Sequence, residues 1–237
     1  MIPEHTLLAK GLHVRPTAMS RLLSAALFLS LTGVAPLALT AQTSVPPNQV
    51  ANFKDTSMLK PPPGVPVAII EWEDLECPAC AHAFPIVHEA LNHYKIPLIR
   101  HDFQIPGHIW SHEASLYARY IQDKISPDLA TEYRREVFAS QYQIASKDDL
   151  HNFTQKFMTT HGKQMPFVVD PTGEFEKEVR ADSALGEKLG LNETPTIIVV
   201  TQKHWIQVKD VMQLYTAIDQ AQAATAGSAA APAAHKK

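Results

Sequence analysis

The chain has 237 residues and a formal net charge of −3 at pH 7. Once its two tails are set aside, this length allows one domain of roughly 150–180 residues. The mildly acidic balance, with no stripe of basic residues, argues against nucleic acid as a partner.

The first 41 residues predict an export signal. The stretch Leu22–Thr40 carries no charge, Arg21 precedes it, and Ala41 offers a small residue at a cleavage point. Met19 alone could begin a compact signal, so the residues before it suggest a misassigned start codon. An uncleaved N-terminal membrane anchor is the alternative, because about 20 apolar residues can span a bilayer. We therefore expect a periplasmic or secreted protein.

Two further segments lack the pattern of a packed core. Residues 42–65 contain five prolines, which oppose both helix and regular strand, and we interpret them as a linker. Residues 221–237 are alanine-rich without core-forming periodicity, and we expect a disordered tail. The folded domain is therefore expected at residues 66–220.

Within that domain the elements follow in the order β-α-β, a helical block, then β-β-α. Short apolar runs predict strands at 67–72, 96–103, 196–200 and 204–208. Apolar residues at three- and four-residue spacing predict a helix after Cys77, four helices inserted at about 107–190, and a last helix from Val211 to Ile218. We expect an α/β fold in which the first two strands are parallel, because a helical crossover connects them.

The only two cysteines stand in Cys77-Pro78-Ala79-Cys80, where the first strand gives way to a helix. Cys77 falls at the N-cap and Pro78 at the first helical position, where a missing N–H has no cost. A helix N-terminus favours a thiolate, so Cys77 is the predicted nucleophile and Cys80 the buried resolving thiol. A purely structural disulfide is the alternative, although so small a loop restricts the unfolded chain little.

Three carboxylates close to Cys77 oppose this assignment. Glu73, Asp74 and Glu76 would disfavour a nearby anion, with Glu76 directly adjacent. If these side chains are solvated, screening weakens their effect on Cys77, and we expect the helix terminus to prevail.

This arrangement resembles the thioredoxin superfamily, and the inserted helical block makes it similar to the DsbA branch, from about Pro66 to Gln220. The residues that carry the resemblance are Cys77-Pro78-Ala79-Cys80, Pro85 in the following helix, Glu71 six residues before Cys77, Thr194-Pro195-Thr196, Leu189-Gly190-Leu191 and Ile105-Pro106. It implies that Glu71 lies beneath Cys80 and exchanges its proton, and that Thr194 and a cis Pro195 face the cysteines and bind extended substrate. Pro78 and Pro85 take structural roles.

The resemblance implies a monomeric thiol:disulfide oxidoreductase that oxidises reduced secreted proteins and is re-oxidised by a membrane redox partner, without a cofactor. A reductase or isomerase of the same fold remains open, as does a peptide-binding module with accessory redox chemistry. A metal-binding, copper-type chaperone also remains open, because two thiols and a histidine are soft ligands. His82 and His88 share the helix of the cysteines, and His108 and His112 are one turn apart. Solvated helix histidines are the favoured explanation, because His82 points away from the cysteine face and four ligands at a recognisable metal-site spacing are absent.

Overall fold

The computed structural model describes residues 53–229, and side chains as far as residue 226. The helices are α1 (Pro78–Tyr94), α2 (Ser111–Lys124), α3 (Pro127–Ser140), α4 (Lys147–Thr160), α5 (Glu174–Leu189) and α6 (Leu214–Ala229), with short 3₁₀ turns at Gln141–Gln143 and Val211–Gln213. The strands are β1 (Val67–Glu73), β2 (Leu98–Asp102), β3 (Thr196–Thr201) and β4 (Trp205–Val208). The predicted order of elements is confirmed.

The four strands form one mixed sheet in the order β2-β1-β3-β4. As predicted, β1 and β2 are parallel, and β3 and β4 form an antiparallel hairpin. β1 pairs with β3 in antiparallel register, so it lies in the centre of the sheet. All seven β1 residues are buried, because both faces of the sheet are covered.

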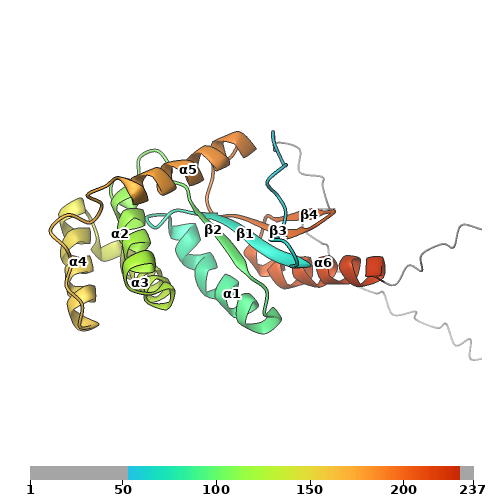
Figure 1. Ribbon diagram of the computed structural model, residues 1–237, viewed down its shortest axis with the longest axis horizontal. Coiled ribbons are helices and arrows are strands. Elements are labelled where there is room, and N and C mark those ends of the chain that lie inside the picture. Colours follow the sequence, from blue (N-terminus) through green and yellow to red (C-terminus); the bar gives the residue numbers. More distant parts are fainter. Residues whose placement is uncertain (1–52, 230–237) are drawn as a thin grey trace, which may run out of the picture. The chain divides into compact units, whose positions relative to one another are not determined.

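Two apolar layers enclose the sheet (Figure 1). On one face, Val67 and Ile69 of β1 pack with residues of α1 and α6. On the other face, Ile70 and Trp72 pack with Leu189 of α5. α5 approaches closely because Gly186 has no side chain; a Cβ there would lie 2.5 Å from the Phe103 ring.

The inserted block lies between β2 and β3 in the sequence. Its helices α2, α3 and α4 gather at one end of the domain, and α5 returns from them along the sheet (Figure 1). Their core is continuous with the start of α1, since Cys80 and Phe84 belong to the same apolar cluster as Trp110 and Tyr133. The redox motif is therefore placed where the block meets the sheet.

The structure corrects the prediction for part of the C-terminal tail and places part of the predicted linker. Residues 221–229, expected to be disordered, continue α6, and Ala221 is buried in the core; alanine has the highest helix propensity, which the argument from periodicity ignored. Of the predicted linker, the described part lies on the domain. Leu59 is buried, and the backbone N–H of Lys54 donates to Leu189 O at 2.9 Å, because prolines forbid regular pairing but not packing.

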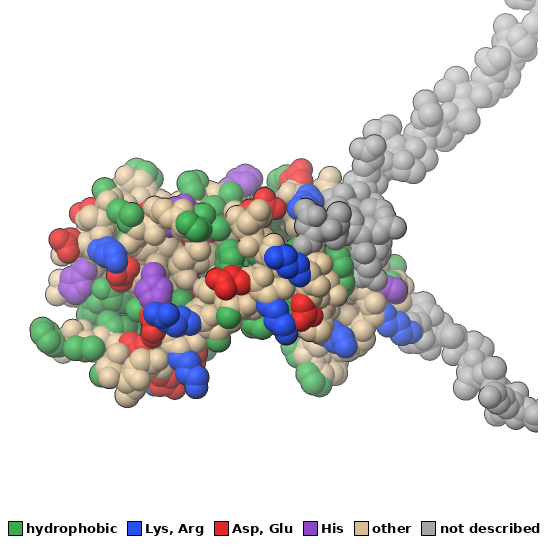
Figure 2. All heavy atoms as spheres, turned by 90° about the horizontal axis from the view of Figure 1, so that it is seen from above, with side chains coloured by type: hydrophobic (Ala, Val, Ile, Leu, Met, Phe, Trp, Pro, Cys, Tyr) green, Lys and Arg blue, Asp and Glu red, His purple; other side chains and the backbone are tan. Residues whose placement is uncertain are grey.

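The predicted signal or anchor at 1–41 lies outside the described residues. Among residues 53–229, no helix combines the length and the hydropathy that crossing a bilayer requires. The face shown in Figure 2 carries acidic and basic side chains close together rather than a surface of one sign.

Candidate active site

The Cys77–Cys80 pair opens α1 as the sequence predicts. Cys77 is the N-cap residue, in extended backbone conformation, and Pro78 begins the helix. Both cysteines are free thiols, so the structure describes the reduced pair. Cys77 is 8% exposed and Cys80 1%, which leaves Cys77 as the sulfur that another molecule can reach.

The two sulfurs have opposite acid–base character. A hydrogen bond from the Cys80 thiol, with further bonds from Thr194 and from the backbone N–H groups of Cys80 and Ala79, outweighs burial and lowers the pKa of Cys77 from 9.0 to about 5. Burial and the Cys77 thiolate raise the pKa of Cys80 well above its usual value. At neutral pH the pair is therefore one thiolate and one thiol, the state that thiol–disulfide exchange requires.

The Thr194-Pro195 loop faces this pair. Its peptide bond is cis, as the resemblance implied, and in its protonated form Cys77 Sγ donates to Thr194 O at 3.3 Å. The structure thus brings Thr194 and Cys77 together across 117 positions of the chain.

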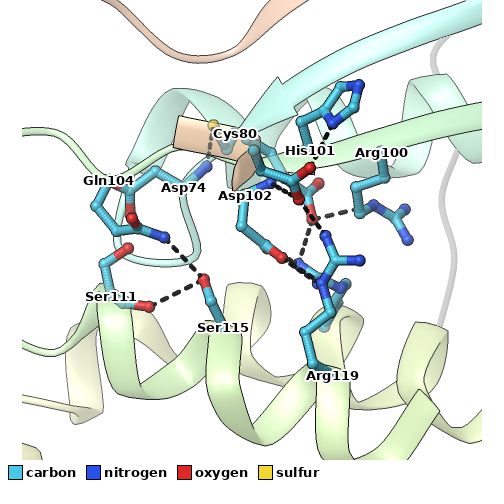
Figure 3. Close-up of polar contacts among 12 residues, drawn as sticks. Asp74, Cys80, Arg100, His101, Asp102, Gln104, Ser111, Ser115 and Arg119 are labelled. Carbon is cyan, nitrogen blue, oxygen red and sulfur yellow. Dashed lines mark hydrogen bonds and ion pairs between the residues drawn. The ribbon is translucent and has the colours of Figure 1, made fainter. Parts of the chain in front are cut away.

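Pro85 lies inside α1, where the sequence placed it. Cys80 lies under the turn that joins β1 to α1. The backbone N–H of Asp74 donates to Cys80 Sγ at 3.4 Å (Figure 3).

Glu71 is buried on β1, and one of its carboxylate oxygens has no partner among the described residues. Burial and the neighbouring Glu73 raise its pKa to about 8, although Arg100 and Arg134 oppose the rise. The carboxylate whose charge acts on Cys80 is Glu73. Side chains alternate along a strand, so Glu71 and Glu73 share the face that α1 covers. The resemblance implied this role beneath Cys80 for Glu71 alone, and the sequence analysis did not connect Glu73 with Cys80.

Two of the three carboxylates next to Cys77 are shielded from solvent, so the condition of screening by water is not met for them. Glu73 and Asp74 are fully buried. Arg134 Nη1 donates to Glu73 Oε1 at 2.7 Å. Asp74 Oδ2 accepts from the backbone N–H of Ile105 at 2.8 Å and lies 2.6 Å from His108 Nδ1.

Glu76 is held differently, by the first turn of α2. Its Oε2 accepts from the backbone N–H groups of Trp110 at 2.7 Å and Ser111 at 3.0 Å. A carboxylate at a helix N-terminus is stabilised by the helix dipole. The thiolate therefore forms beside carboxylates whose charge is balanced by partners, rather than screened by water.

Arg134 is the site residue that the sequence gave no reason to select. It is 1% exposed, and besides Glu73 its Nη1 donates to Asp102 Oδ1 at 2.8 Å. Arg119 Nε also donates to Asp102, at 2.7 Å (Figure 3). Burial alone would raise the pKa of Asp102, but Arg134 and Arg119 overcome this and lower it to about 2. The sequence contains one signal for Arg134: it lies among the apolar positions of a predicted helix, and an arginine that is buried there needs a charged partner.

The histidines make contacts within the protein. His88 Nε2 accepts from Arg100 Nη2 at 2.9 Å, and His112 Nε2 lies 2.7 Å from Glu176 Oε2. Among the described residues, the group close enough to hold a metal ion is Asp123, Glu174 and Glu178, which does not include the cysteines.

Comparisons with known proteins agree with this geometry. A family model described as thioredoxin matches residues 57–220. A search of curated protein sequences finds no match.

Solved structures share the fold at low identity. Alpha-DsbA1 from Wolbachia pipientis is 16% identical, with 76% of this chain and 96% of that chain covered and a TM-score of 0.55. Oxidised BdbD from Bacillus subtilis is 18% identical, with 74% and 97% covered and a TM-score of 0.55. A periplasmic thioredoxin-like protein from Salmonella enterica serovar Typhimurium is 15% identical, with 66% and 84% covered and a TM-score of 0.51. The chain belongs to the thioredoxin family, and its fold is that of the DsbA-like thiol-disulfide oxidoreductases.

Proposed function

We propose that the chain is an exported thiol:disulfide oxidoreductase that oxidises the thiols of secreted proteins. The observation that carries the proposal is the asymmetry of the pair: an accessible Cys77 with a pKa of about 5 beside a buried Cys80 whose pKa is raised. Stabilising the Cys77 thiolate stabilises the reduced form, and a more stable reduced form makes the disulfide a stronger oxidant.

The reaction begins from the oxidised pair. A substrate thiolate attacks Cys77 Sγ, the Cys77–Cys80 bond breaks, and Cys80 leaves with the electron pair and takes a proton. A second substrate thiolate then attacks the substrate sulfur of the mixed disulfide, and Cys77 leaves as a thiolate. The substrate loses two electrons and the pair gains them. Cys77 is the better leaving group of the two because its pKa is lower.

Glu71 is the proposed proton carrier for Cys80, because a carboxyl with a pKa near 8 can hold or release a proton at neutral pH. Thr194 and Pro195 are the proposed contact for extended substrate, on the strength of the hydrogen bond between Cys77 and Thr194 O. A membrane redox partner would accept the two electrons and restore the disulfide.

Export is supported by the uncharged Leu22–Thr40 stretch behind Arg21, and by the likeness to a structure described as periplasmic. Disulfides persist in oxidising compartments, where an oxidase can act. Size-resolved detection of the full-length and processed chain in the exported fraction distinguishes a cleaved signal from a retained anchor.

A redox titration of the Cys77–Cys80 pair against glutathione tests the direction of the reaction. We expect a potential clearly above the roughly −270 mV of thioredoxin. A value at or below that figure would remove the oxidase and leave a reductase of the same fold. In parallel, Cys80→Ser whose Cys77 is first charged as a mixed disulfide with glutathione should exchange glutathione, which leaves as a thiolate, for a thiol of a reduced substrate protein. It should then accumulate the mixed disulfide with that substrate, whereas Cys77→Ser treated in the same way should form none.

A further inference from the structure

A pocket lies between β2 and the helices α1, α2 and α3, away from the cysteines. It encloses about 330 Å³ and is lined by His88, Leu91, Leu98, Arg100, Arg119, Gln122, Pro127, Thr131 and Arg134. Three of these side chains are arginines, each from a different element. Among the residues that line it, none is a carboxylate.

The carboxylates that balance these arginines contact them without lining the pocket. Asp102 accepts from Arg119 and Arg134, and Glu73 accepts from Arg134 and lies 3.0 Å from Arg100 Nε. Arg119 Nη2 also donates to Asp182. Figure 3 shows Arg119 reaching from α2 towards Asp102, with Arg100 on the same strand as Asp102. These contacts hold the three guanidinium groups in place, and the three arginines line the pocket.

Arg134 also has a donor left over. Its side chain is 1% exposed, and its Nε is buried without a hydrogen-bond partner in the described part of the chain. A buried N–H without an acceptor is costly and rare in folded proteins. An acceptor that binds beside Arg100 and Arg119, and displaces the side chains that cover Arg134 Nε, would supply the missing partner.

His88 shows independently that the surroundings are positive. Burial, followed by the charges of Arg100, Arg135 and Arg134, lowers the pKa of His88 to about 4. Its Nε2 accepts from Arg100, so the ring is neutral and adds no charge of its own. The arginine charges are thus felt at the pocket wall in spite of the carboxylates.

We propose that this pocket binds a small oxyanion, a phosphate or sulfate group. Guanidinium groups match such oxygens in planar geometry, and the Gln122 amide and Thr131 hydroxyl add neutral polar groups at the wall. The proposal does not depend on the thiol chemistry, and it adds a ligand site at a distance from the cysteines.

The test is a titration of the intact protein with sodium sulfate, inorganic phosphate and glycerol 3-phosphate. The NMR signal of Arg134 Nε–H is recorded at each ligand concentration. Sodium chloride at matched ionic strength is the reference. We expect saturable shifts with the oxyanions, and a rise in melting temperature that follows occupancy. Equal saturation by the free ions and the ester assigns the site to the oxyanion alone; tighter binding of the ester assigns it to an esterified phosphate. Shifts that never saturate, or that match chloride, overturn the proposal.

Variants at Gln122 place a charge at the pocket without removing any ion pair. Gln122→Glu should weaken sulfate binding by about tenfold or more, because the new carboxylate repels and competes with the anion. Gln122→Lys should keep or tighten it. The matched control is Gln155→Glu, an exposed position in the C-terminal half of α4, which changes net charge equally and should bind as the parent does. If Gln122→Glu and Gln122→Lys bind sulfate with equal affinity, the anion does not bind in this pocket.

Discussion

The sheet and the inserted helical block contribute different things to the redox site. The sheet side supplies the thiols on α1, the cis loop before β3, and the acids on and just after β1. The block supplies partners for those acids: Arg134 for Glu73, and the first turn of α2 for Glu76. Asp74 is held between the two, by the loop that leads from β2 to α2.

This division explains how an acidic turn can precede a thiolate. Three carboxylates stand between Trp72 and Cys77, yet the pKa of Cys77 is lowered to about 5. Each carboxylate is already paired or hydrogen-bonded, so its charge is balanced locally. The block therefore supplies partners for the acids beside a reaction whose reacting sulfurs it does not carry.

Arg134→Met should give the largest loss of stability, because Arg134 is the residue of the block that contacts both Glu73 and Asp102. It leaves Glu73 and Asp102 buried without their shared cation, and loss of one partner from a buried ion pair costs roughly 3–5 kcal/mol. Urea unfolding at pH 7 should report a loss of that size. The triple variant Glu73→Gln, Asp102→Asn, Arg134→Met should recover most of it. A loss below about 1 kcal/mol for Arg134→Met would mean that water or Arg119 replaces the pairing.

Glu71→Gln tests the buried acid on β1 that forms no ion pair with the inserted helical block. The folded protein raises the pKa of Glu71 from 4.5 to about 8, so the native state holds a proton that the unfolded chain releases. The stability linked to that proton is fully present below pH 4.5 and is lost as pH rises through about 8. Glu71→Gln should therefore gain about 5 kcal/mol over the parent at pH 8.5 if the whole shift from 4.5 to about 8 is expressed, and nothing at pH 4.

Glu73→Gln is the control, because it sits two residues away on the same face. It removes the partner of Arg134 instead of an unpaired acid, so it should destabilise the protein at both pH values. A Glu71→Gln gain that does not change with pH would show that Glu71 keeps an ordinary pKa.

The local parts of this site could be predicted from the sequence. Cys77 at the N-cap, Pro78 at the first helical position and the strand before them depend on neighbours in the chain. Even Glu73 was within reach, because β1 runs two residues past Glu71 and alternation places both acids on one face.

The contacts that balance charge could not be predicted in this way. Arg134 and Glu73 are 61 positions apart, and Glu76 is 34 positions from the backbone N–H group of Trp110. Periodicity indicates that α3 has a buried face but not which residue of another element that face meets. For this reason the sequence left open whether Glu73 and Asp74 are solvated, and the structure shows both to be buried.

Glu76 gives the smallest effect and the sharpest test of the comparison. Glu76→Ala removes the acceptor for two N–H groups at the start of α2, and should cost about 1 kcal/mol, as loss of a helix cap does. Glu76→Gln keeps an oxygen acceptor and removes only the charge, so its cost should be about half of that.

If the α2 terminus balances this carboxylate, the rate of Cys77 alkylation against pH should keep its midpoint at about 5 in Glu76→Gln. Glu113→Gln, which removes one charge from the first turn of the same helix, is the matched control. A midpoint that falls by more than about one unit in Glu76→Gln alone would show that the adjacent carboxylate does oppose the thiolate, and that the helical block balances only Glu73 and Asp74.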